Sequence, residues 1–532
     1  MSEPAYSVGQ ALTQALPEHV ARVVSTALER PADRGLAAEA ADLLTKARQN
    51  SATEIDQLLG ALDPSVLLSS RLHELAVDHD SRAALDVTGL NRFHWTLGTG
   101  AHGASTDAGA VREYYRLCGR WVAAASWLPA FREVEDGLPL TLQLAPDAES
   151  LRRIFPMEVR FHWVARMVLH GAADLVAEGA IDSAATPWLT RAAIDEAFDH
   201  IAEWGQEWPP SVPPLGADAR HLLEFVAAPR LPGRTFETLI HDHRMDSFPL
   251  VLVQGRPVPA AQRECLLGLD TAFVSALVGR HPDVGGDVFE RIVSRCLAQV
   301  LGDARELPGP LAVRLSATDG GQVDLAVCDD EVLLLGECKA YSTQRAPHTA
   351  VNAFTDTAGS VVRQLAKRLD GARSGTPLAT GCGSVSPADW ADLYGVGVVL
   401  TTSGGAVWDA NVVRPILSNR PDTAIIPLHQ LLTVAAAFPS ATDLVDYLRF
   451  RDQVLSLGPV LKDEVDLFML YRSPIRDPIM SCLRRPAPGV AHVLAPFRVT
   501  DPSVAMDEPR PSDPDTWRQR LWDVLSTDLA RS

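Results

Sequence analysis

The chain has 532 residues, of which 46% are hydrophobic and 22% are charged. This composition is typical of globular proteins and excludes a largely disordered chain, and the length predicts about three domains. The 67 acidic residues outnumber the 48 basic ones, so the formal net charge is −19. This charge excludes a protein that binds nucleic acid over its whole surface, because only a local basic patch would attract a polyanion.

The cysteines indicate neither a disulfide framework nor a structural zinc module. There are seven, and no two of them form a CxxC pair. Scattered cysteines of this kind are typical of a reducing compartment. No segment of about 18 apolar residues is present, so no membrane span is predicted. We therefore expect a cytoplasmic protein with no membrane partner.

The region from residue 1 to 280 is predicted to be mainly helical. Apolar residues recur there every three or four positions, which is the period of an amphipathic helix. The clearest stretches are residues 36–47, 111–125, 159–177 and 192–204. We expect a recognition or regulatory region composed of one or two subdomains.

From about residue 281 the pattern changes to alternating helices and short strands. Helices are expected at 287–301, 360–369 and 428–438, and strands at 311–316, 322–328, 332–338, 395–401 and 423–427. Such alternation predicts an α/β domain with a central mixed sheet over residues 281–450. Residues 451–532, with an amphipathic segment at 517–529, are expected to form a C-terminal appended element. The predicted fold class is therefore multidomain, α followed by α/β.

Charged residues stand at the ends of two of these apolar strands. Because side chains alternate along a strand, Glu337 and Lys339 project from one face while Cys338 projects from the other. The preceding strand reverses through an acidic turn at 329–331 and can place Asp324 beside Glu337. Two carboxylates in this position suit Mg²⁺, which prefers oxygen ligands, and an adjacent ammonium can orient or help deprotonate a water. The alternative is a surface ion pair without a metal.

This arrangement resembles the PD-(D/E)XK nuclease superfamily, in which a strand Asp precedes a Glu-X-Lys on the next strand. Twelve residues separate Asp324 from Glu337, and Val323 stands where the family commonly has a Pro. The resemblance implies a restriction-endonuclease-like α/β domain and Mg²⁺ bound by Asp324, Glu337 and the backbone carbonyl of Cys338. It also implies that Lys339 activates the attacking water and that Mn²⁺ can substitute for Mg²⁺.

The resemblance implies two further site residues. Family members often have another Glu on the helix before the sheet, where Glu290 is found, and some have a polar residue on the helix after the third strand, where Gln364 is found. For Glu290 a solvated carboxylate on a helix face is an equally acceptable interpretation.

A local basic segment follows the Glu-X-Lys. Between Lys339 and Arg373 there are six Lys and Arg residues and two acidic residues. Phosphate contacts of this kind give affinity with little sequence information. The candidates for nucleic-acid binding are Arg345, Arg363, Lys367 and Arg368. A solvated helix face remains the alternative for each of them.

Together these features predict a Mg²⁺-dependent endonuclease. We expect DNA as the substrate, with RNA left open, and a bacterial restriction or anti-phage defence role by analogy. A protein partner or a homodimer is compatible with the sequence. The competing prediction is a non-catalytic scaffold, in which a nuclease fold serves as an interaction protein within a nucleic-acid-processing complex.

Overall fold

The computed structural model describes residues 12–68, 90–137, 161–181, 185–203, 215–242, 244, 248–260, 262–307, 311–314, 320–340, 347–380, 383–401, 407–408, 410–417, 420–457, 460–461, 463–473, 476–484 and 493–494. The chain forms two compact units, Met1–Pro156 with Asp199–Cys265 and Met157–Phe198 with Leu266–Ser532. Most of the described residues are helical, and mixed sheets lie in the C-terminal half. None of the described helices is long and apolar enough to cross a membrane.

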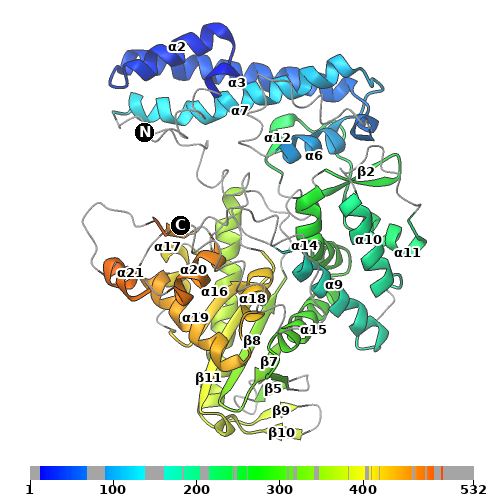
Figure 1. Cartoon of the computed structure of the whole chain (residues 1–532), viewed down its shortest axis with the longest axis vertical. Helices are drawn as coiled ribbons and strands as arrows, with labels where there is room; N and C mark the ends of the chain where they lie inside the picture. The colour runs from blue at the N-terminus through cyan, green and yellow to red at the C-terminus, as the bar shows by residue number, and fades with distance from the viewer. Residues whose placement is uncertain are drawn as a thin grey trace. The chain divides into compact units, whose positions relative to one another are not determined.

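The first unit is built around two long helices, α3 (Arg34–Ala61) and α7 (Ala108–Glu135), which pack along one another (Figure 1). Asp33 and Asp107 cap their N-termini by accepting hydrogen bonds from backbone N–H groups of the first turn. The other described elements are α2 (Glu18–Glu29), η1 (Pro64–Leu68), α6 (Leu90–Gly100), α11 (Ala217–Phe225), α12 (Phe236–Ile240) and a small sheet of β1 (Ala227–Ala228), β2 (Leu250–Val253) and β3 (Arg256–Pro259). The helices expected at 36–47 and 111–125 are confirmed, whereas the small sheet was not predicted.

The second unit includes helices from both sides of the expected boundary at residue 280. These are α9 (His162–Ala177), α15 (Pro282–Val300) and the larger parts of α10 (Arg191–Glu203) and α14 (Gln262–Arg280). Helix α9 packs against α15, and Arg295 of α15 forms an ion pair with Glu178 just after α9. The structure thus divides the chain differently from the expected regions 1–280, 281–450 and 451–532. The helical period identifies α9 as a helix but contains no information about its packing partner.

A mixed sheet of five strands, in the order β12-β11-β8-β7-β4, forms the centre of the second unit (Figure 1). Its strands are β4 (Arg305–Glu306), β7 (Leu325–Cys328), β8 (Val332–Lys339), β11 (Asp392–Val399) and β12 (Thr423–Pro427). Strands β8, β11 and β12 are parallel, while β7 and β4 run antiparallel to their neighbours. The predicted mixed sheet is therefore confirmed, and so are the strands expected at 332–338, 395–401 and 423–427.

A second, antiparallel sheet has the order β10-β9-β5-β6. Its strands are β5 (Leu311–Arg314), β6 (Gly320–Val323), β9 (Leu378–Thr380) and β10 (Gly383–Val385). The single strand expected at 322–328 is broken at Asp324, because β6 pairs with β5 whereas β7 pairs with β8. Opposite this break, a Cβ on Gly336 would clash with the side chain of Leu325. Gly336 therefore leaves the space that the Leu325 side chain occupies.

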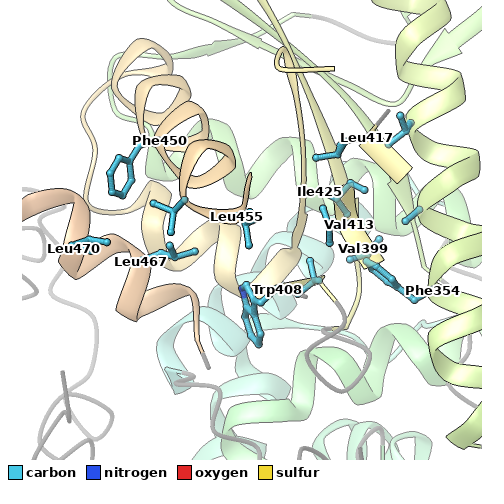
Figure 2. Close-up of a cluster of buried hydrophobic side chains, with 14 of the residues drawn as sticks. Phe354, Val399, Trp408, Val413, Leu417, Ile425, Phe450, Leu455, Leu467 and Leu470 are labelled. Carbon is cyan, nitrogen blue, oxygen red and sulfur yellow. The ribbon is translucent and has the colours of Figure 1, made fainter. Parts of the chain in front are cut away.

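Helix α16 (Pro347–Arg373) packs against β11 and β8, and it is much longer than the helix expected at 360–369. A Cβ on Gly397 would lie 2.5 Å from Cγ1 of Val361, so the glycine is what lets α16 lie close to the sheet. Figure 2 shows the core that α16 shares with β11, β12 and the following helices, including Phe354, Val399 and Ile425.

The remaining described elements complete this unit. They are η2 (Pro387–Asp389), α17 (Ala410–Leu417), α18 (Leu428–Ala435), α19 (Ala441–Ser456), β13 (Val460–Leu461), α20 (Glu464–Arg472), α21 (Arg476–Leu483) and β14 (Val493–Leu494). The expected boundary at 450 falls within α19, and α20 packs against α19 and α18 in the same unit. The amphipathic segment expected at 517–529 lies outside the described residues.

Candidate active site

Asp324 and Glu337 lie opposite each other at the junction of β6, β7 and β8. The antiparallel register pairs Leu325 with Gly336, which makes Asp324 and Glu337 the next pair. Lys339 extends its Nζ to 2.8 Å from Oε1 of Glu337 and 3.8 Å from Oδ2 of Asp324. The structure therefore brings together the three side chains on which the sequence argument depends.

The Asp324 carboxylate is held by the neighbouring strand. Its side chain is 8% exposed, and its Oδ2 accepts a 2.8 Å hydrogen bond from the backbone N–H of Cys338. Burial and the nearby charge of Glu337 raise the pKa of Asp324 to about 6, although the Cys338 N–H and the Lys339 and Arg368 cations oppose the rise. The ionised carboxylate is therefore costly at neutral pH without further positive charge.

Glu337 is the more deeply buried of the two acids, with a side chain that is 2% exposed. Its Oε1 faces Lys339, whereas its Oε2 is buried and has no hydrogen-bond partner among the described residues. The nearest cation to Oε2 is the guanidinium of Arg368, at 3.5 Å. A buried carboxylate oxygen without a hydrogen bond is unfavourable unless another group compensates for it.

Lys339 is a charged ammonium at neutral pH. Its side chain is 36% exposed. Burial alone would lower its pKa, but the hydrogen bond to Glu337 and the charges of Glu337, Asp324 and Glu290 raise it above its usual value. An ammonium with a raised pKa can orient a water and stabilise negative charge, but it does not accept a proton at neutral pH.

Glu290, on α15, belongs to the same electrostatic cluster. Helix α15 packs against β7 and β8, and the Glu290 side chain is half-buried. Burial and the charge of Asp324 raise the pKa of Glu290 to about 7, with Lys339 opposing the rise. This coupling favours a site role for Glu290 over a solvated carboxylate, because a fully solvated group would keep its ordinary pKa.

The candidate site residues on α16 form two groups, of which one is partly buried and the other is exposed. Gln364 and Arg368 are one helical turn apart, and the Arg368 side chain is only 11% exposed. The sequence places Arg368 among the phosphate contacts, but the structure instead directs its guanidinium toward Glu337 and the Gln322 carbonyl. Arg363 and Lys367 are exposed and form no ion pair within the described ranges, whereas Arg345 lies outside them.

The donor set for a divalent cation is small. Within the described ranges, no three His, Cys, Asp or Glu side chains gather in a group that could hold a metal ion. What is present are the carboxylates of Asp324 and Glu337 together with the backbone carbonyl of Cys338. Burial raises the pKa of the Cys338 thiol well above its usual value, and the alternation of side chains along β8 directs the thiol to the face opposite Glu337 and Lys339. An all-oxygen donor set that includes the buried Oε2 of Glu337, which has no hydrogen-bond partner among the described residues, fits Mg²⁺, which keeps several waters when bound to proteins.

Comparisons of the chain with protein-family models, with curated proteins and with solved structures gave no match.

Proposed function

We propose that the chain is a metal-dependent nuclease with a restriction-endonuclease-like domain of the PD-(D/E)XK type. The observation that supports this best is the position of the Lys339 ammonium, 2.8 Å from Glu337 and 3.8 Å from Asp324 at the junction of β6, β7 and β8. Among the described residues, the carboxylates of Asp324, Glu337 and Glu290 face one ammonium and one guanidinium, and this excess of acidic groups suits a site completed by a divalent cation.

Asp324, Glu337 and the carbonyl of Cys338 would hold Mg²⁺ or Mn²⁺. The bound cation would supply positive charge beside the scissile phosphate. The chain holds both carboxylates in place. Asp324 accepts a hydrogen bond from the Cys338 N–H of β8, and Glu337 is buried between Lys339 and Arg368.

Lys339 and Glu290 have complementary roles in this proposal. Lys339 orients the water and stabilises negative charge on the phosphate oxygens, because it stays protonated. Glu290, whose pKa is raised to about 7, accepts the proton. The water oxygen forms a bond to phosphorus, the bond from phosphorus to the leaving nucleoside oxygen breaks, and that oxygen takes a proton from solvent.

DNA is the substrate we propose, and the exposed cations Arg363 and Lys367, which lie on the same helix as Gln364 and Arg368, would contact its phosphates. Cations spaced by one helical turn can contact successive phosphates without reading bases. A restriction or anti-phage role in bacteria would suit such a nuclease. RNA has the same phosphate chemistry and is therefore included in the test.

The test is cleavage of supercoiled plasmid DNA and of single-stranded RNA by the full-length protein with Mg²⁺, with Mn²⁺ or with EDTA. Lys339→Met removes the ammonium, and Lys46→Met, at an exposed position in the first unit, is the matched control. We expect metal-dependent DNA cleavage that K46M retains and K339M loses by a factor of about 10² to 10⁴. Equal cleavage by K339M and the wild type would contradict the proposal.

The second candidate is a non-catalytic nuclease-fold scaffold. It is favoured by one observation, that no group of three metal-binding side chains occurs among the described residues. Thermal melting with Mg²⁺ separates the two, because a ligand that binds only the folded state raises the melting temperature. A scaffold without a metal site would show no shift, whereas the nuclease should show one that disappears in Asp324→Asn.

A further inference from the structure

Arg368 makes a set of contacts that the proposed chemistry does not use. From α16, its Nε donates to the carbonyl of Gln322 over 2.6 Å and its NH1 donates to the carbonyl of Gln364 over 3.0 Å. Its NH2 lies 3.5 Å from Oε2 of Glu337. One planar group therefore touches the helix, the strand that leads to Asp324 and the second site carboxylate.

The backbone of β6 leaves room for this guanidinium. A Cβ on Gly321 would lie 3.1 Å from NH2 and 3.2 Å from Cζ of Arg368, which is tighter than ordinary van der Waals contact. Gln322, the acceptor of the shortest hydrogen bond, stands two residues before Asp324. Moving the guanidinium would therefore disturb the strand just before the site as well as Glu337.

We propose that Arg368 is a positioning residue that fixes the relative placement of the Asp324 and Glu337 carboxylates for metal binding. This inference rests on the proposed function, since it assumes that these carboxylates bind a divalent cation. The guanidinium fixes the position of β6 through its hydrogen bond to the Gln322 carbonyl, and it limits the orientation of the Glu337 side chain through the contact with Oε2. The hydrogen bond to the Gln364 carbonyl orients the guanidinium itself. Groups that orient metal ligands in this way strongly affect metal affinity.

Charge and geometry predict opposite effects, which makes the proposal testable. A cation 3.5 Å from Glu337 repels a divalent ion, so a role limited to charge balance predicts tighter metal binding once the guanidinium is removed. A positioning role predicts weaker binding despite the removal of that repulsion. The sign of the change therefore distinguishes the two roles.

The experiment measures Mn²⁺ binding to the full-length protein by electron paramagnetic resonance of free Mn²⁺, with no nucleic acid present. The variants are Arg368→Met, Arg368→Lys and Gly321→Ala, and Arg112→Met, at an exposed position on α7, is the matched control. We expect R368M to weaken binding about tenfold and G321A, which keeps the charge, about threefold. R368K should recover only part of the loss, because one ammonium cannot replace the planar fork, and R112M should bind like the wild type.

The outcomes separate this inference from the proposed function. Wild-type protein that binds no Mn²⁺ would overturn the proposed function and this inference with it. Mn²⁺ binding by the wild type that is unchanged or tighter in R368M would overturn the inference alone. If R368M does not fold, the G321A variant provides the test. Weaker Mn²⁺ binding by G321A would support the positioning role, and unchanged binding would contradict it.

Discussion

The backbone N–H of Cys338 donates a 2.8 Å hydrogen bond to Oδ2 of Asp324, so that β8 holds the acid at the point where β6 becomes β7. The N–H of Asp324 in turn donates to the carbonyl of Gly336 over 3.1 Å. Both the backbone and the side chain of Asp324 are thus fixed by the strand that contains Glu337. A site built on sheet backbone keeps its geometry better than one built on a loop.

Asp324→Asn should stabilise the metal-free protein at pH 8. The amide can still accept the hydrogen bond from Cys338. The substitution removes a buried carboxyl group whose pKa is raised to about 6 and which is therefore charged at pH 8. We expect an increase of about 1–3 kcal/mol in the free energy of unfolding and no further stabilisation by Mg²⁺. Thermal melting in EDTA and in Mg²⁺ measures both effects, and a D324N protein that Mg²⁺ still stabilises would disagree with the account.

Stability and metal affinity should change with pH in opposite directions. Burial raises the pKa of Asp324 to about 6 and that of Glu290 to about 7, above the unfolded value of about 4. Between about pH 4 and pH 7 the folded metal-free protein binds protons that the unfolded chain releases, so its stability falls as the pH rises.

A cation must displace these protons, so Mg²⁺ affinity should increase from pH 6 to pH 8 and binding at pH 6 should release protons. Calorimetry in two buffers with different ionisation enthalpies measures the number of protons that metal binding releases. The same affinity at both pH values, with no proton release, would show that Asp324 is not a metal ligand.

The juxtaposition of Asp324 and Glu337 could be predicted because short strands with alternating side chains and an acidic turn between them leave little freedom of register. The break in the strand at Asp324 could not, since it results from pairing with β5 on one side and β8 on the other. Each partner strand is a sequence neighbour, but the residues from 322 to 328 read as one continuous strand, and nothing in their pattern marks the change of partner.

Arg363→Ala with Lys367→Ala should weaken DNA binding without changing the chemical step. Both side chains are exposed and unpaired within the described ranges. If each contacts one phosphate, the slope of log affinity against log salt should fall by about two. Fluorescence anisotropy across a salt series measures the slope, with Lys46→Ala as control. An unchanged slope would show that these two side chains do not contact the DNA phosphates.

Glu464→Gln should destabilise the second unit. Glu464 is fully buried and accepts hydrogen bonds from Arg451, Trp408 and Tyr447. Removing its charge leaves the buried Arg451 without its counter-ion, which typically costs about 3–5 kcal/mol. Urea unfolding followed by tryptophan fluorescence measures the loss. Asp477→Asn in the exposed pair with Arg476 should leave the midpoint unchanged, and equal effects of the two variants would contradict the argument.

Arg368 illustrates why part of the site could not be predicted. In the sequence it is one of several cations on a helix, and a phosphate contact is a reasonable interpretation. Only the packing of α16 on the sheet brings its guanidinium to Gln322 and Glu337, with Gly321 leaving the space. Helical spacing gives the neighbours of Arg368 along the helix, but it does not give the strand that the helix contacts.

The most direct test of the central claim is single-turnover cleavage of a labelled DNA duplex by Glu337→Gln at saturating Mg²⁺. Glu337 is buried between Lys339 and Arg368, and within the described ranges it forms no ion pair with the exposed cations of α16. We predict that E337Q lowers the cleavage rate at least about 10³-fold while DNA affinity stays within about threefold of the wild type. Wild-type cleavage by E337Q, or no cleavage by either protein under any metal condition, would contradict the account.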